Sequence, residues 1–145
     1  MLRSKLLAAL AVTLFIIGMG ITGCAQTYKV KTVELKSGEK VLDISGLWDT
    51  QIEHYGSYSG YGKFSTVTEI KQKGSSFVGI RKKATRYHQA GSKTFQGELD
   101  KNGFKKFQIL TRYGAMDTVA IMSDDGKTIT TDTPNFVKTI MTRKE

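Results

Sequence analysis

Few side chains in this chain offer the chemistry of an enzyme or of a metal site. Cys24 is its only cysteine, and its two histidines, His54 and His88, lie far apart in the sequence. Neither histidine belongs to a closely spaced pair of the His-x3-His kind, so the sequence predicts no metal site, and nothing in it indicates a cofactor. Gly56-Ser57-Tyr58-Ser59-Gly60 looks at first like a nucleophile elbow, but its central residue is tyrosine. Without a nucleophile or an acid–base pair, we do not expect an enzyme.

Cys24 itself ends a segment that is typical of an export signal. Arg3 and Lys5 form a basic head, and residues 6–21 are an almost unbroken apolar run. That run is short for a membrane span, which needs about 20 apolar residues, and it has the layout of a secretory signal. We therefore expect residues 1–23 to be removed as a signal peptide. The alternative is an uncleaved signal anchor in which the cysteine is incidental.

The four residues at the end of this signal, Ile21-Thr22-Gly23-Cys24, resemble the lipobox of bacterial lipoproteins. In that family a small residue precedes an obligatory cysteine. The resemblance implies cleavage before Cys24, a diacylglyceryl thioether on its sulfur, and acylation of the new amino terminus by a chain such as palmitate. Two or more acyl chains anchor a protein stably, whereas one anchors it only marginally. The expected partner is therefore a membrane, held through lipidated Cys24.

Ala25 follows the cysteine where lipoproteins often place Asp for retention in the inner membrane. The resemblance therefore implies a lipid-anchored location in the cell envelope, in the outer membrane, facing the periplasm or the cell surface. The charge is basic: 22 Lys and Arg against 13 Asp and Glu give +9, and loss of Arg3 and Lys5 leaves 20 − 13 = +7. In the envelope the matching polyanions are lipid head groups, acidic glycans or acidic protein faces rather than nucleic acid. Alternatively, the lysines are simply solvated faces and turns.

Beyond a polar segment, the chain alternates apolar and polar residues with the period of two that is typical of β-strands. Residues 24–41 are expected to form the lipidated tether, although Val30–Leu35 could add a short edge strand. Tight turns such as Asp100–Gly103 and Asp124–Gly126 punctuate the rest. The pattern predicts eight strands, over residues 42–53, 62–72, 77–83, 93–99, 104–112, 115–123, 127–132 and 136–143.

Eight short antiparallel strands in sequence order predict an all-β fold, with no helix after the signal. We expect residues 42–145 to form a single up-and-down barrel, because closing the sheet removes its exposed edges. A barrel of this size holds at most one small ligand. It would be full if four phenylalanines all pointed inward: Phe64, Phe77, Phe95 and Phe107. A shift of one residue in register decides whether Arg81 lies in the lumen or on the surface.

Gly46-Leu47-Trp48, on the first predicted strand, looks like the Gly-x-Trp signature of lipocalins and related calycins. In that family an arginine late in the last strand packs across the tryptophan, and Arg143 stands at the corresponding place. The resemblance implies a small lipocalin-like barrel in which Gly46, Trp48 and Arg143 have structural roles.

An up-and-down barrel places alternate turns at the same end. The two long connections, residues 54–61 and 85–92, therefore share one end with the turns at Tyr113 and Pro134, and all the barrel's tyrosines and both histidines gather there. Tyr, Ser and Gly suit an adaptable binding surface, although tyrosines also cap barrel ends for structural reasons. The expected ligand- or partner-binding residues are Tyr55, Tyr58, Tyr61, Arg86, Tyr87, His88 and Tyr113.

Two functions are consistent with this arrangement. The first is a lipid-anchored binding protein of the cell envelope that takes a small amphipathic or anionic ligand at the tyrosine-rich mouth. The second is a protein-interaction module, such as an inhibitor, an assembly factor or an adhesin, that uses the same loops on a filled barrel. The volume of the lumen distinguishes the two.

Overall fold

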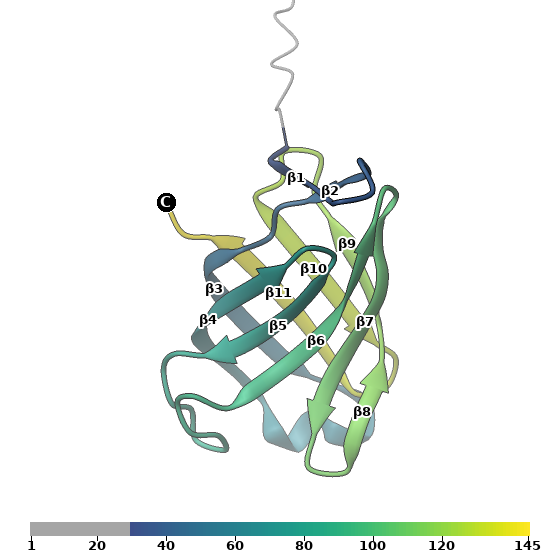
Figure 1. Ribbon diagram of the computed structural model, residues 1–145. Coiled ribbons are helices and arrows are strands. Elements are labelled where there is room, and N and C mark those ends of the chain that lie inside the picture. Colours follow the sequence, from purple (N-terminus) through teal and green to yellow (C-terminus); the bar gives the residue numbers. More distant parts are fainter. Residues whose placement is uncertain (1–29) are drawn as a thin grey trace, which may run out of the picture.

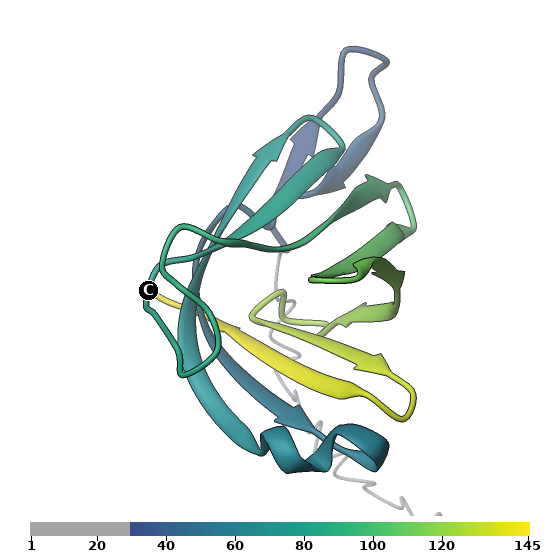
Figure 2. The ribbon, with the colours of Figure 1, turned by 90° about the horizontal axis from the view of Figure 1, so that it is seen from below.

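The computed structural model describes residues 30–145, and their fold is all-β, as predicted. A two-stranded hairpin precedes a nine-stranded antiparallel sheet that curls into a nearly closed barrel (Figure 1). Figure 2, viewed from below, shows the strands curving around a common interior. The elements are β1 (Thr32–Glu34), β2 (Lys40–Leu42), β3 (Gly46–His54), the 3₁₀ helix η1 (Gly56–Tyr61), β4 (Lys63–Lys73), β5 (Ser76–Arg81), β6 (Lys93–Asp100), β7 (Gly103–Thr111), β8 (Gly114–Asp117), β9 (Val119–Met122), β10 (Thr128–Thr133) and β11 (Val137–Arg143).

The two outermost strands of the sheet, β8 and β9, are consecutive in the chain and are joined only by Thr118. The Thr118 amide donates to the Phe107 carbonyl on β7 at 3.0 Å, and its hydroxyl donates to the Asp132 carbonyl on β10 at 2.9 Å. The two edges of the sheet therefore meet at this residue. The prediction of one strand over residues 115–123 is wrong here, because β8 pairs with β7 whereas β9 pairs with β10. This division gives nine strands instead of eight.

The first predicted strand, residues 42–53, is also interrupted. The Asp43 carboxylate accepts hydrogen bonds from the amide and the hydroxyl of Ser45, at 3.1 and 2.5 Å. Such a local turn competes with strand pairing. Strand β3 consequently begins only at Gly46.

The β1–β2 hairpin covers one end of the barrel, at the top of Figure 1. Val41 is buried in the core, and Val33 and Leu35 pack against it. Part of the segment expected to be tether is therefore folded onto the barrel. The alternative of a strand within Val30–Leu35 describes it better, although this strand pairs with β2 rather than with the edge of the main sheet.

The core occupies the part of the barrel next to this hairpin. Phe77, Phe95 and Phe107 are buried there, with ring centroids between 4.9 and 6.3 Å apart. Two glycines make room for the rings, because a Cβ on Gly79 would overlap Phe95 and one on Gly97 would overlap Phe77. Aromatic packing of this kind, rather than the hairpin alone, fills this end of the barrel.

Trp48 lies fully buried at the start of β3, with Arg143 from β11 against it. The Arg143 guanidinium carbon is 4.5 Å from the centre of the Trp48 ring. Its two amino groups donate to the carbonyls of Ser45 and Asp43 at 2.8 and 2.7 Å, and the indole N–H donates to the Ile44 carbonyl at 2.9 Å. Arg143 thus ties the last strand to the turn that precedes the first strand of the barrel.

This packing gives a test of the closed end. Trp48→Ala should lower the free energy of unfolding by about 3–5 kcal/mol, the usual loss for a large buried aromatic side chain. Arg143→Ala should lower it by less, and the double variant by less than the sum, because the two side chains contact one another. Chemical denaturation of the four proteins measures the coupling. Strictly additive losses would contradict an energetic role for the stacked pair.

Candidate functional site

A cavity of about 380 Å³ opens the barrel interior at the end opposite the hairpin. Four tyrosines stand at its mouth, from η1, from the β5–β6 connection and from the β7–β8 turn: Tyr58, Tyr61, Tyr87 and Tyr113. Its deeper wall includes Phe95, Phe107 and Met141, which also belong to the core. The hollow therefore begins where the aromatic core ends.

The short helix η1, which the sequence pattern did not predict, positions the first of these tyrosines. Gly56 begins it with a φ of 59°, and a side chain there would overlap Asn135 in the β10–β11 turn. The Asn135 side-chain oxygen accepts a hydrogen bond from the Ser57 amide at 3.2 Å, and the Tyr55 amide donates to the Phe136 carbonyl at 3.0 Å. The first and last connections of the barrel are thereby held together.

The rings at the mouth contact one another. His54 lies within 5.4 to 5.8 Å, between ring centroids, of Tyr61, Phe64 and Phe136. Tyr61 lies 5.3 Å from Tyr87 in an edge-on arrangement. Each such pair contributes about 0.5–1.5 kcal/mol beyond its buried area, so the mouth is a preformed aromatic surface.

Arg81, at the end of β5, is the buried charge of the cavity. The register of β5 turns it inward with Phe77 and Gly79, and only 4% of its surface is exposed. Its Nη1 donates to the Thr85 hydroxyl at 3.0 Å, whereas its buried Nε has no hydrogen-bond partner among residues 30–145. Burial lowers the pKa of the Arg81 guanidinium from its ordinary value. The lumen thus contains a cation whose hydrogen bonds are incomplete.

The histidines and the charged side chains that line the cavity are all basic: His54, Arg81, His88, Lys93 and Arg112. Within the described part of the chain, no Asp or Glu lines it. Thr131 adds a buried hydroxyl that has no partner among residues 30–145. A cleft of low dielectric that is lined by positive charge favours anions over neutral molecules and cations.

Most of the predicted site residues meet at this cavity. Tyr58, Tyr61, Tyr87, His88 and Tyr113 line it. Arg86 does not line it and lies beside Tyr87, with its guanidinium carbon 5.6 Å from the ring centre. Cys24 lies outside the described residues.

Tyr55 also lies outside the cavity lining. Its hydroxyl donates to the Asp132 carboxylate at 2.5 Å and to the Thr133 carbonyl at 3.0 Å. The hydrogen bond to Asp132 raises the pKa of Tyr55. This tyrosine therefore links the connection after β3 to the end of β10.

The prediction that four inward-pointing phenylalanines would fill the barrel is wrong. Phe77, Phe95 and Phe107 are buried in the core, and Phe64 lines the cavity, so all four phenylalanines face the interior. A hollow nevertheless remains, because the three core rings fill only the part of the barrel next to the hairpin. Several lining residues were not predicted as site residues, among them Lys93, Arg112 and Thr131. The most deeply buried charge that was missed is Arg81, and its alternation with Phe77 and Gly79 was the available signal.

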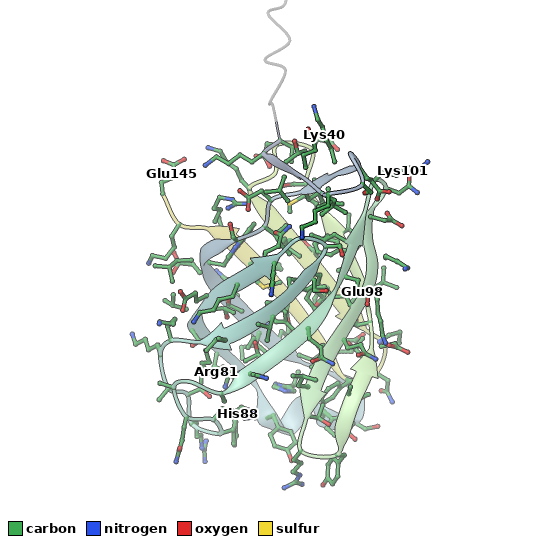
Figure 3. All side chains as sticks on the ribbon, viewed as in Figure 1. Lys40, Arg81, His88, Glu98, Lys101 and Glu145 are labelled. Carbon is green, nitrogen blue, oxygen red and sulfur yellow. The ribbon has the colours of Figure 1, made fainter. Side chains whose placement is uncertain are left out.

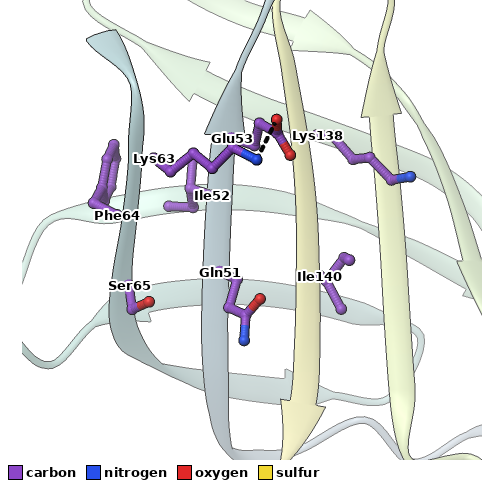
Figure 4. Close-up of a pocket in the computed structure, with 8 residues that line it drawn as sticks. All are labelled: Gln51, Ile52, Glu53, Lys63, Phe64, Ser65, Lys138 and Ile140. Carbon is purple, nitrogen blue, oxygen red and sulfur yellow. Dashed lines mark ion pairs between the residues drawn. The ribbon is translucent and has the colours of Figure 1, made fainter.

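A second depression, of about 250 Å³, lies over β3, β4 and β11 (Figure 4). Its charged residues include Glu53 and Lys63, which form an ion pair at 2.7 Å with both side chains exposed. An exposed pair of this kind contributes about 0–1 kcal/mol. No unpartnered buried group converges on this depression among the described residues.

Among residues 30–145, no helix is long and apolar enough to cross a membrane, and no group of three or more metal-ligating side chains comes together. A scan against protein-family models finds no match, and searches of curated proteins and of solved structures find none either. The function must therefore be inferred from the geometry of the cavity.

His88 reports on the electrostatics of this cavity (Figure 3). His88 is exposed, but partial desolvation of its ring lowers its pKa from 6.5, and the positive charges of Arg81 and His54 lower it further. The unfolded chain therefore takes up this proton at a higher pH than the folded protein. It follows that the stability contributed by neutral His88 is present above about 6.5 and decreases as the pH falls below that value.

We expect Arg81→Met to raise the pKa of His88, since one of the two repelling charges is removed, but to leave it below 6.5 because the desolvation persists. Nitrogen and proton NMR of the imidazole ring measures this pKa. Arg86→Met is the matched control, because Arg86 lies in the β5–β6 connection with His88 but does not line the cavity. It should change the pKa of His88 by less. An unchanged His88 pKa in Arg81→Met would show that the two groups do not interact.

Proposed function

We propose that this protein is a lipid-anchored binding protein of the cell envelope that takes a small amphipathic, anionic ligand into its barrel. The observation that carries the proposal is the cavity itself, which is open at one end, lined by aromatic rings and basic side chains, and free of acidic residues in the described chain. Its volume of about 380 Å³ falls within the range of about 300–1,000 Å³ for ligand pockets.

The division of the lining suits an amphipathic molecule. Tyrosine, phenylalanine and methionine side chains offer apolar contact to a hydrocarbon or aromatic group, and the basic side chains offer charge to an acidic group. Tyrosine rings provide large contact area at a small entropic cost, since they have few rotatable bonds. A protein with this lining would bind such a ligand without a cofactor.

The resemblance to lipocalins supports the same function. Strands β8 and β9 form the two edges of the nine-stranded sheet and are joined in the chain only by Thr118, so the barrel is nearly closed. Arg143 lies against Trp48, as the lipocalin resemblance implies. A barrel of about this size leaves room for at most one small ligand.

The place of the β1–β2 hairpin suggests how a lipid on Cys24 would orient the barrel. Val30 leads into the β1–β2 hairpin, which covers the end of the barrel opposite the cavity (Figure 1). A tether of residues 24–29 spans at most about 20 Å when fully extended. If Cys24 carries the lipid, the closed end lies near the membrane and the mouth faces away from it, toward a soluble donor or acceptor of ligand.

A second candidate, an interaction with another envelope protein, is favoured by one observation. Met116, Val119 and Ile121 expose 40, 65 and 64% of their surfaces on β8 and β9, next to Tyr113 at 79%. Exposed apolar residues that gather in this way often mark contact surfaces. Val119 and Ile121 lie at the seam outside the cavity, whereas Met116 and Tyr113 also line it.

The anchor is tested at Cys24. Cys24→Ser should prevent lipidation, so that the precursor stays uncleaved or the protein leaves the detergent-dependent fraction, because no second cysteine can take its place. Fractionation of membranes with detection of the acylated amino terminus by mass spectrometry measures the result. Recovery of the unaltered protein chiefly from inner-membrane fractions would contradict the outer-membrane location.

The mouth is tested by alanine substitutions at its exposed tyrosines. Tyr58→Ala, Tyr87→Ala and Tyr113→Ala should each weaken binding by about 1 kcal/mol or more if the rings contact ligand. Tyr113→Ala should leave the melting temperature nearly unchanged, since its ring is 79% exposed. The ligand is the molecule that co-purifies with the native lipoprotein, identified by mass spectrometry, and its Kd is measured alongside the melting temperature.

Two control sets separate the candidates. Lys101→Ala and Asn102→Ala, in the β6–β7 turn at the closed end, should change neither binding nor stability. Val119→Ser and Ile121→Ser should leave small-ligand binding intact. If the seam variants abolish binding of the co-purified molecule while the tyrosine variants do not, the mouth is not the binding site.

A further inference from the structure

Arg81 is held inside the barrel in a state that is costly for a cation. A buried charge is normally paired or fully hydrogen-bonded, because its transfer from water is unfavourable. Arg81 is 4% exposed, forms no ion pair within residues 30–145, and donates one hydrogen bond, from Nη1 to the Thr85 hydroxyl. The fold therefore leaves this guanidinium without its usual partners.

Two donor groups of Arg81 that make no hydrogen bond to residues 30–145, Nε and Nη2, lie on one edge of the guanidinium. Its Nε has no partner, and Nη2 donates no hydrogen bond to the described residues. Nε and Nη2 form the side-on edge of the planar group, whose two parallel N–H bonds match two oxygens of one carboxylate. An oxyanion on this edge would supply the missing partners and the missing charge together.

Among residues 30–145, no side chain around Arg81 supplies them. Its partner in the β4–β5 register is Thr68, whose hydroxyl is already engaged with Thr50 at 2.9 Å. His88, Lys93 and Arg112 are basic, and no acidic residue of the described chain lines the cavity. The unpartnered Thr131 hydroxyl, on β10, lines the same cavity and offers a further hydrogen bond.

We infer that Arg81 binds the acidic group of the ligand inside the cavity, and so acts as its internal anchor. The ligand is an amphipathic acid whose single carboxylate pairs with the Nε–Nη2 edge. Its apolar part contacts the phenylalanine, methionine and tyrosine side chains of the wall. This inference rests on the proposed function and specifies the ligand's class and orientation. Figure 3 shows Arg81 nearer than His88 to the middle of the barrel, so the acidic end enters the lumen beyond the rim.

A single carboxylate fits better than a phosphate monoester. The buried lining provides one guanidinium, and the other cations, Lys93 and Arg112, belong to exposed residues. One buried positive charge neutralises a monoanion, whereas a dianion would retain an unpaired charge at the same depth.

The test compares three probes of equal chain length on the full chain in non-ionic detergent: octanoate, octanol and octylammonium. Octanoate should bind at least about tenfold more tightly than octanol, the ratio expected from one charge-assisted hydrogen-bonded pair. Octylammonium should bind most weakly. Carbon NMR of octanoate labelled at its carboxyl carbon gives the Kd, and it should show a pKa below that of the free acid, since the bound anion is paired.

Arg81→Met keeps the length and apolar volume of the side chain but removes the charge and the donors. It should abolish the preference for octanoate over octanol and restore the ordinary pKa of the octanoate carboxyl group. Arg81→Lys should retain part of the preference. Arg86→Met, which removes a charge outside the cavity lining, is the matched control and should change the ratio by less than about threefold.

The melting temperature distinguishes an anchor from a structural arginine. Without ligand, Arg81→Met should melt at or above the temperature of the unaltered protein, because an unpaired buried charge has been replaced by an apolar side chain. Octanoate should raise the melting temperature of the unaltered protein but not that of Arg81→Met. A fall in melting temperature with an unchanged octanoate-to-octanol ratio would assign Arg81 to the fold alone.

Other outcomes overturn the inference in distinguishable ways. If octanol binds as tightly as octanoate, the cavity binds amphipathic molecules as proposed, but Arg81 is not its anchor. If octylammonium binds best, or Arg86→Met acts like Arg81→Met, the charge selectivity comes from elsewhere. If no probe binds while a co-purified molecule depends on the mouth tyrosines, the ligand does not reach Arg81. If neither probes nor co-purified molecules depend on the mouth, the proposed function itself fails.

Discussion

The packing of phenylalanine rings against glycines on β5 and β6 determines how the barrel interior is divided. Gly79 lies opposite Phe95 in the register of these strands, and Phe77 lies opposite Gly97. Each ring occupies the space that a side chain on the facing glycine would need. The two pairs therefore place large volume at the level of the core, where Phe107 joins them. Interiors pack densely only where such volume is supplied.

Beyond this aromatic layer, inward positions are taken by threonines on β3, β4 and β10 and by Arg81 on β5. Thr50 and Thr68 satisfy one another by a hydrogen bond at 2.9 Å, whereas Thr131 and Arg81 each retain a buried atom without a partner in the described chain. Apolar side chains at these places would have extended the core. Their replacement by polar groups is the physical reason that the barrel is hollow at one end and full at the other.

Much of this architecture could be predicted from the sequence. The alternation of apolar residues predicts the all-β sheet, and the alternation of turns predicts that Tyr58, Tyr87 and Tyr113 share one end, as they do around the cavity. Both inferences depend on local periodicity and on the order of the strands, which the chain itself displays.

The remaining features depend on contacts between distant segments. Thr118 divides a strand because its amide and hydroxyl bond to carbonyls on two different strands, β7 and β10. Tyr55 was predicted to bind ligand on the same grounds as the neighbouring tyrosines, yet its hydroxyl donates a hydrogen bond to Asp132. The inward orientation of Arg81 depends on the register of β5, and a shift of one residue would have exposed it. Periodicity alone carries none of this information.

Two arginines of the barrel, Arg81 and Arg143, serve different purposes. Burial lowers the pKa of both guanidinium groups, but that of Arg143 is partly restored by the negative charge of Asp43. Arg143 donates from both amino groups to backbone carbonyls and stacks on Trp48, so the protein itself supplies its partners. Arg81 faces a cavity instead, with one donor used. The protein supplies partners for Arg143, which stabilises the closed end of the barrel. It leaves the Nε of Arg81 without a partner among residues 30–145, and we infer that this arginine selects the ligand that enters the open end.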